Sequence, residues 1–197
     1  FIVLMSAPGI PGLSLIQQQS KDILMRSGIQ KTDIVKRYTK MMGEIYQIAA
    51  SPQPEEIAKT NIQNVYQKSW KTFSSGEQKL LNLEPTFPES QMQMLLSNWF
   101  RSFLRFQPAQ YLKQIRCPVL AINGSEDVQV SAKENLGGIK KSLPKHPKSE
   151  ILEIPGLNHL FQTCHFCTVS EYGILTETIQ PAVLEKMTTW IQKTVSP

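Results

Sequence analysis

Two stretches decide the fold of this chain: Ile122-Asn123-Gly124-Ser125-Glu126-Asp127 and Pro155-Gly156-Leu157-Asn158-His159-Leu160-Phe161. Each belongs to or follows a short apolar run typical of a buried strand, and each places an ionisable residue a few positions beyond the end of that strand. In α/β proteins, functional residues collect at the carboxyl ends of parallel strands. The two stretches therefore predict neighbouring strands of a parallel sheet, with Asp127 and His159 at the same edge.

Asp127 and His159 have the arrangement of an acid–base pair. An imidazole becomes a useful general base near neutral pH when its other ring nitrogen donates to a buried carboxylate. On its own, a strand-end Asp is most often a turn or helix N-cap, and a single His is most often structural. Their joint placement, with the acid before the histidine, favours two members of a Ser-His-Asp triad. We therefore predict Asp127 as the acid and His159 as the base.

Three apolar runs predict the strands of the sheet, at residues 1–5, 117–123 and 150–154. The first run is apolar on both faces, as in a parallel sheet, and no strand-like neighbour follows it until residue 117. Around the last two runs we expect helices at residues 108–115, 131–143 and 181–195. This order of helices and strands indicates the last portion of a parallel α/β sheet.

Between the first two strands, the spacing of the apolar residues changes to three and four, which predicts helices. Gly28 is expected to cap the first helix, and Thr32 to be the N-cap of the second. Pro54 is expected to open a third helix, and Pro88 to start a fourth that runs to Leu104. The region between the strands is therefore an all-helical insertion.

A resemblance to a known family rests on three segments, Phe1–Gly12, Asn123–Val130 and Pro155–Gln162. They resemble the later part of bacterial α/β-hydrolase-fold esterases, the EstD-like carboxylesterase group. Ser170–Tyr172 and the segment at 177–179 also fit that group, as does the final helix. The resemblance covers nearly the whole chain.

The resemblance implies an incomplete α/β-hydrolase fold, with about three C-terminal parallel strands, flanking helices and a helical cap insertion. Residues 1–12 and 109–197 correspond to the core of that fold, and residues 13–108 to the cap. It also implies a serine hydrolase that cleaves small-molecule carboxylic esters through an acyl-enzyme, without a cofactor, and with Asp127 and His159 in its catalytic triad.

Three aromatic residues of the expected cap, Trp99, Phe100 and Phe103, are candidates for contact with the acyl part of a substrate. Packing within the cap is the more conservative interpretation of all three. A non-catalytic or degenerate hydrolase-like module, which binds a hydrophobic ligand or a partner through the cap, is the alternative to an enzyme. Retention of an acid and a base on neighbouring strand ends favours the enzyme.

The nucleophile of the expected triad has no candidate in this chain. The family's serine lies in a G-x-S-x-G elbow, and that motif does not occur here. Ser6 has Leu4 and Pro8 where the motif has glycines, and Ser125 stands beside two acids. By resemblance, Phe1 begins the strand that follows the serine. We therefore expect a C-terminal part of a longer enzyme, inactive alone, whose first strand exposes an edge to the upstream part of the same protein.

The segment Cys164-His165-Phe166-Cys167 has a spacing that suits a metal or redox site. A zinc site normally needs four ligands, and the remaining donors, His146, His159 and Cys117, have no partner spacing. We expect a loop with incidental cysteines and no metal site. A local disulfide in an oxidising compartment is the next possibility.

The bulk composition restricts the partners of the chain. A length of 197 residues with 41% hydrophobic content suits one globular domain with a sizeable core. The net charge of +5 is spread thinly, so nucleic acid is not expected as a partner. No apolar run is long enough to predict a membrane span, and the localisation stays open.

Overall fold

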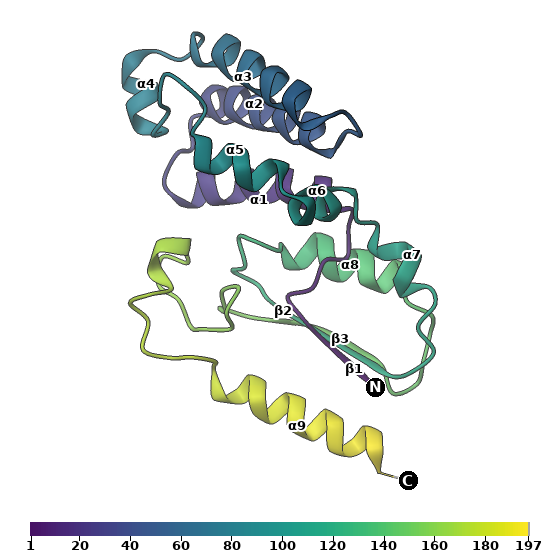
Figure 1. The fold of residues 1–197 in the computed structure, drawn as a ribbon. Helices are drawn as coiled ribbons and strands as arrows, with labels where there is room; N and C mark the ends of the chain where they lie inside the picture. The colour runs from purple at the N-terminus through teal and green to yellow at the C-terminus, as the bar shows by residue number, and fades with distance from the viewer. Residues whose placement is uncertain (197) are drawn as a thin grey trace. The chain divides into compact units, whose positions relative to one another are not determined.

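The computed structural model describes residues 1–196 of the chain. The chain divides into two compact units, which Figure 1 shows as ribbons. The sheet unit consists of Phe1–Pro11 and the chain from Gln107 onward, and the helical unit consists of Gly12–Phe106. Within the described residues, no helix is both long enough and apolar enough to cross a membrane.

The sheet unit is built on three parallel strands, β1 (Ile2–Met5), β2 (Val119–Gly124) and β3 (Glu150–Ile154). The central strand is β2, and all six of its residues are buried. The expectation of a small parallel sheet with flanking helices is therefore confirmed. β1 has a neighbour on one side, since Ile2 lies opposite Val119, while its other edge has no strand partner within residues 1–196.

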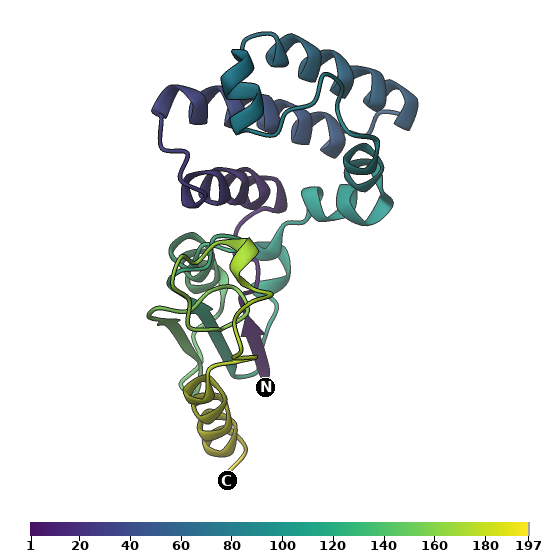
Figure 2. The ribbon, with the colours of Figure 1, turned by 90° about the vertical axis from the view of Figure 1, so that its left-hand side faces the viewer.

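Helices cover both faces of this sheet, as the two views in Figures 1 and 2 show. The helices α7 (Pro108–Leu112) and α8 (Ala132–Ser142) pack on one face, and α9 (Pro181–Val195) packs on the other. Because successive side chains of a strand point to opposite faces, alternate residues of the strands enter two different cores. The core beneath α9 contains the buried residues Leu120, Ile122, Leu157, Phe161, Val183 and Trp190.

α8 packs closely on the loop that follows β1. The N–H of Gly9 donates to Asn135 Oδ1 at 2.9 Å, and a Cβ atom on Gly138 would lie 2.1 Å from the carbonyl oxygen of Gly9. An added Cβ on Gly137 would have no described atom within 4 Å. The two adjacent glycines of α8 are therefore under different constraints, because only position 138 faces a backbone contact.

We expect the substitutions Gly137→Ala and Gly138→Ala to have opposite effects on stability. Alanine at 137 should raise the free energy of unfolding by about 0.5–1 kcal/mol, the usual advantage of alanine over glycine inside a helix. Alanine at 138 should lower it by about 1–3 kcal/mol, because the loop at Gly9 must move away. Urea unfolding followed by circular dichroism measures both, and equal effects at the two positions would show that this contact is absent.

The helical unit is formed by α1 (Gly12–Arg26), α2 (Thr32–Ala50), α3 (Glu55–Trp70), α4 (Ser75–Leu80), α5 (Glu89–Leu96) and α6 (Asn98–Arg105). α2 is the central helix and packs against α1, α3 and α6. It buries Met41 and Ile45 completely, as the apolar spacing of its sequence predicts.

The helical unit differs from the expected helices at three places. Thr32 is the first residue of α2, not its N-cap, because Lys31 occupies the cap position. The single helix expected from Pro88 is divided at Ser97, whose hydroxyl accepts a hydrogen bond from the N–H of Phe100 and caps α6. α4 was not expected, and it has no buried residue from which apolar spacing could indicate it.

Polar contacts hold α4 in the helical unit. Ser74 and Glu77 form a capping box, and the Glu77 carboxylate binds Arg37 of α2 at 2.6 Å. Arg37 also lies over the ring of Phe73, with its guanidinium carbon 4.6 Å from the ring centre. The hydrogen bond from Arg37, together with the backbone N–H of Ser74, lowers the pKa of Glu77 to about 2.

We expect this ion pair to make stability depend on pH at the acidic end. The pKa of Glu77 is lower in the folded state than its ordinary value of 4.5, so its stabilising contribution is complete above that value. The contribution is lost as the pH falls toward about 2. The difference in melting temperature between the wild type and Glu77→Gln should therefore shrink over this range. The exposed Glu44→Gln variant is the control, and the same pH trend in it would contradict the assignment.

Candidate active site

The first element of the site is the turn that follows β2. Asp127 Oδ1 accepts hydrogen bonds from the N–H groups of Gln129 and Val130, each at 2.8 Å. This pattern, in which an aspartate satisfies backbone donors two and three residues ahead, is a common way to close a tight turn. It uses one carboxylate oxygen and leaves Oδ2 available.

Asn123, a buried residue within β2, supports the same carboxylate. Its side-chain Nδ2 donates to Asp127 Oδ2 at 3.2 Å and to the carbonyl oxygen of Val130 at 2.8 Å. Its Oδ1 is buried without a hydrogen-bond partner among the described residues. The amide therefore fixes both the orientation of the carboxylate and the far end of the turn.

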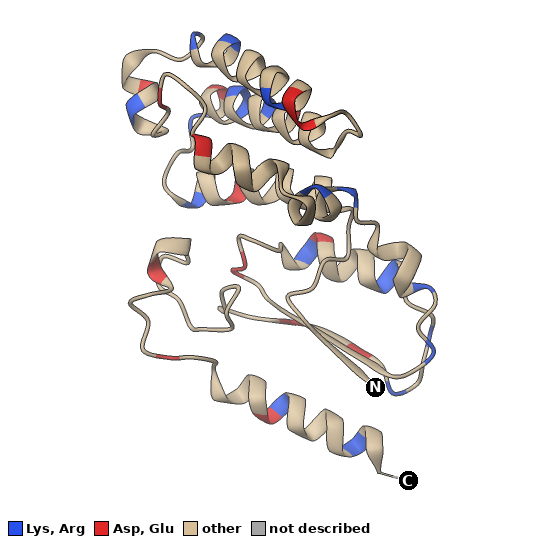
Figure 3. Cartoon of the chain, viewed as in Figure 1, with Lys and Arg blue, Asp and Glu red and all other residues tan. Residues whose placement is uncertain are grey.

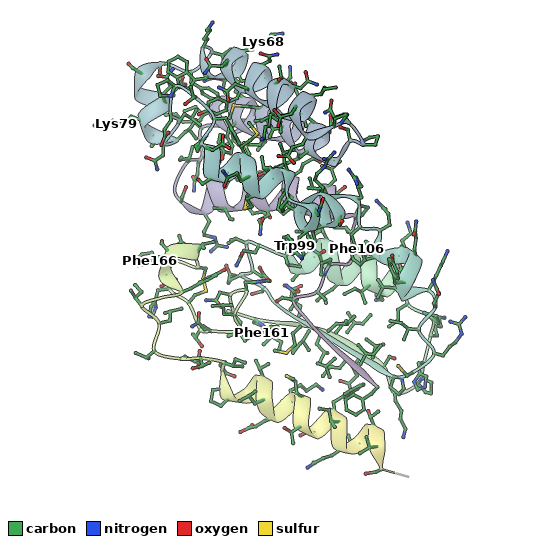
Figure 4. The ribbon with its side chains drawn as sticks, in the orientation of Figure 1. Lys68, Lys79, Trp99, Phe106, Phe161 and Phe166 are labelled. Atoms are coloured by element: carbon green, nitrogen blue, oxygen red, sulfur yellow. A yellow bond between two sulfur atoms is a disulfide. The ribbon has the colours of Figure 1, made fainter. Side chains whose placement is uncertain are left out.

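The second element is the loop after β3, which is held by Asn158. Asn158 Oδ1 accepts from the N–H groups of Leu160 and Gln162 at 2.9 and 3.0 Å, and the backbone N–H of Asn158 donates to the carbonyl oxygen of Gln162. Phe161 adopts a left-handed backbone with φ of 60° and turns its ring into the core, where it is labelled in Figure 4. These contacts fix the backbone on both sides of His159 and so orient its side chain.

Backbone contacts join the two loops directly. The N–H of Ser125 donates to the carbonyl oxygen of Ile154 at 2.9 Å, and the N–H of Glu126 donates to that of Leu157 at 3.0 Å. A Cβ atom on Gly124 would lie 2.1 Å from the Leu157 oxygen, so glycine is needed at this close approach. The acid loop and the histidine loop are thus joined directly through their backbones.

The structure brings Asp127 and His159 into direct contact. His159 Nδ1 lies 2.9 Å from Asp127 Oδ2, the Asp127 side chain has no exposed surface, and the His159 side chain is 27% exposed. Since a carboxylate only accepts hydrogen bonds, Nδ1 donates, and the neutral ring then has its lone pair on Nε2. Within residues 1–196, the ring forms this one hydrogen bond.

Tyr172 packs beside this pair. Its hydroxyl accepts from Gln129 Nε2 at 3.1 Å and forms a hydrogen bond with the backbone of His159. Burial, followed by the charge of Asp127, raises the pKa of Tyr172, and the hydrogen bonds partly offset this effect. Tyr172 therefore connects the segment that follows the histidine loop to both loops of the site.

Neither serine near the strand ends is bonded to His159. Ser125 Oγ accepts from the N–H of Gly156 at 2.9 Å and contacts Glu126, so it serves the junction between the loops. Ser6, at the end of β1, has a φ of 43° and a buried hydroxyl with no partner among the described residues.

The aromatic candidates lie in α6 of the helical unit. Trp99 is 71% exposed and stacks on Phe103, with the ring centres 5.7 Å apart, whereas Phe100 is buried. Figure 4 labels Trp99. Trp99 is thus an exposed ring stacked on the half-buried Phe103, and Phe100 contributes to packing within the unit.

The expectation of incidental cysteines at 164 and 167 is wrong, because the structure contains a Cys164–Cys167 disulfide and Cys117 is free. The loop closed by this bond is held by Glu171, which accepts from the N–H groups of residues 165, 166 and 167. Burial, the largest single influence, raises the pKa of Glu171, but the three N–H donors outweigh it and the net shift is downward.

Sequence reasoning missed the supporting residues Asn123, Asn158, Glu171 and Tyr172. A polar residue inside an apolar strand is the signal that could have identified Asn123, because a buried amide must find partners. The other three make their contacts within irregular loops, and no residue spacing indicates such contacts.

Basic and acidic residues are interspersed along the ribbon of both units, as Figure 3 shows. Comparison with known protein families finds no family model that matches the chain, and comparisons with curated proteins and with solved structures find no match.

We expect Asp127→Ala to disrupt the site and to destabilise the fold. The N–H groups of Gln129 and Val130 would lose their acceptor, which should lower the free energy of unfolding by about 1–3 kcal/mol. The Nδ1 proton of His159 should also lose its low-field NMR signal. Glu153→Ala, an exposed carboxylate on β3, is the control and should change stability by less than about 0.5 kcal/mol. Similar losses in both variants would contradict this description of the turn.

Proposed function

We propose that Asp127 and His159 are the acid and base of a serine hydrolase that cleaves carboxylic esters. The proposal is supported by the 2.9 Å hydrogen bond between a carboxylate without exposed surface and a partly exposed imidazole. A general base needs this combination, because the acid must hold the ring while the other ring nitrogen reaches the substrate. The resemblance to EstD-like carboxylesterases points to the same chemistry.

In the proposed reaction, His159 Nε2 takes the proton of the attacking serine hydroxyl, and Asp127 stabilises the imidazolium that forms. The serine oxygen bonds to the carbonyl carbon of the ester, and the imidazolium gives its proton to the departing alcohol. Water then attacks the acyl-enzyme with the help of the same base. This step releases the carboxylic acid and restores the serine.

We infer that the serine belongs to the upstream part of the same protein, outside residues 1–197. Ser125 is engaged between the two loops, and Ser6 is buried without a bond to His159. The open edge of β1 can accept a further parallel strand, whose carboxyl end would lie at the same edge of the sheet as the acid–base pair. On this proposal, residues 1–197 alone do not hydrolyse esters.

Trp99 and Phe103 are proposed as contacts for the acyl group of the ester, because an exposed Trp ring stacked on a half-buried Phe ring suits an apolar ligand. The same observation favours a second candidate function, in which the helical unit binds a hydrophobic ligand or partner without catalysis. The two functions differ in their dependence on His159, since binding through α6 does not need a base.

We expect both members of the pair to control turnover in a form of the protein that includes the upstream part. His159→Ala should lower kcat roughly a million-fold. Asp127→Asn should lower kcat about ten-thousand-fold, because the wrong tautomer is then favoured. KM should change little in either variant. Hydrolysis of p-nitrophenyl butyrate and labelling by a fluorophosphonate measure these effects.

His165→Gln is the matched control, since His165 is exposed and its side chain forms no hydrogen bond with the pair. Full activity of the His159→Ala variant would refute the assignment of the base. Ester turnover by residues 1–197 alone, abolished by His159→Ala, would show that the nucleophile lies within this chain.

A further inference from the structure

The Cys164–Cys167 disulfide is the feature of the sheet unit that the proposed reaction does not use. It closes a loop of four residues, starting two positions after Gln162, and the chain just before it forms an antiparallel bridge between Leu157 and Thr163. In the chain-entropy account, a bond that closes so short a loop contributes least to global stability. Its effect is therefore to be sought in the local structure.

Locally, one cysteine of the disulfide has a backbone conformation that its residue type disfavours. Cys167 has a φ of 55°, in the left-handed region that favours glycine, and it is buried. Its N–H donates to Glu171 at 2.7 Å, beside those of His165 and Phe166. The same short loop is thus held twice, by the disulfide between its ends and by the hydrogen bonds from its N–H groups to Glu171.

A direct path of contacts leads from this loop to the acid–base pair. Glu171 ends a short 3₁₀ helix (Val169–Glu171), and the next residue, Tyr172, binds Gln129 and the backbone of His159. Gln129 in turn donates its N–H to Asp127. The segment 163–172 therefore supports the site from outside, through Tyr172.

We propose that Cys164–Cys167 is a reversible thiol–disulfide site, and that its reduction by a dithiol reductant loosens residues 163–172 and weakens their support of His159. Cys164 is partly exposed, and Phe166 of the same loop, which is labelled in Figure 4, is 75% exposed, whereas Cys167 is buried. A reductant thus reaches the sulfur of Cys164 first. The consequence for catalysis rests on the proposed function, but the change in the segment does not.

The reduction is a two-electron exchange. A thiolate of the reductant attacks Cys164 Sγ, which forms a mixed disulfide and releases Cys167 Sγ as a thiolate that takes up a proton. The second thiolate of the reductant then attacks the reductant's own sulfur in the mixed disulfide. Cys164 leaves as a thiolate and is protonated, and the reductant becomes a disulfide. The protein gains two electrons and two protons, which the dithiol loses.

Alkylation with iodoacetamide, with and without dithiothreitol and under native conditions, tests the chemistry. Cys164 and Cys167 should be alkylated only after reduction, and Cys117, which is free, is the internal reference. Alkylation of Cys164 and Cys167 without reductant would overturn the proposal. So would stoichiometric zinc uptake by the reduced protein, because the two sulfurs and a Glu171 oxygen lie within 4.8 Å of one another and could then form a metal site.

Hydrogen exchange and NMR test the structural consequence in the same chain, without any ester. In the reduced protein and in Cys164→Ser/Cys167→Ser, amides of residues 163–172 should exchange roughly tenfold faster. This is the ratio expected when the cost of the left-handed conformation at position 167 is no longer offset by the disulfide. The imidazole signals of His159 should broaden. Unchanged exchange in this segment, or faster exchange with unchanged His159 signals, would overturn the proposed coupling.

A glycine variant separates the disulfide from the backbone conformation that it holds. Cys164→Ser/Cys167→Gly should keep exchange in residues 163–172 slow and should not respond to dithiothreitol, because glycine adopts a positive φ without cost. Cys117→Ser should behave like the wild type. If the glycine variant is as loose as the serine variant, the left-handed residue is not the origin of the effect and the proposal fails.

Discussion

The arrangement of the loops at the carboxyl edge of the sheet depends on one constraint. The Asp127 carboxylate has no exposed surface. A buried carboxylate is costly unless hydrogen-bond donors replace the water that it has lost. Two backbone N–H groups, the amide of Asn123 and the imidazole of His159 supply these donors. This need for donors explains three features together: the turn after β2, the polar residue inside that strand, and the position of the histidine loop.

A second buried carboxylate in the same unit solves the problem differently. Glu171 receives only backbone donors, and these keep its pKa below the ordinary value despite burial. A backbone N–H cannot pass on a proton, so Glu171 is suited to holding a loop. One donor to Asp127 is the imidazole of His159, which can gain or lose a proton and is partly exposed. The pair Asp127 and His159 is therefore suited to acid–base chemistry.

Regular elements with strong periodic signals could be predicted from the sequence. The strand Glu150–Ile154 and the helix Pro181–Val195 have the expected bounds, and the placement of Asp127 and His159 at one sheet edge follows from the topology of parallel strands. Three kinds of feature could not be predicted in this way. α4 is held by the contact between Arg37 and Glu77, and the helix break at Ser97 is a matter of local capping. The disulfide occurs together with a backbone conformation at Cys167 that cysteine rarely adopts.

The topology of the sheet also separates the assembly of the pair Asp127 and His159 from the free edge of β1. Asp127 and His159 follow β2 and β3, and backbone hydrogen bonds between their loops fix the pair without any contribution from the free edge of β1. A serine carried by a strand beside β1 would approach His159 from across that strand. The preorganisation of the pair is therefore built within the sheet unit. For this reason the geometry of the pair is a property of this chain, whereas on the proposed function ester cleavage needs a further strand.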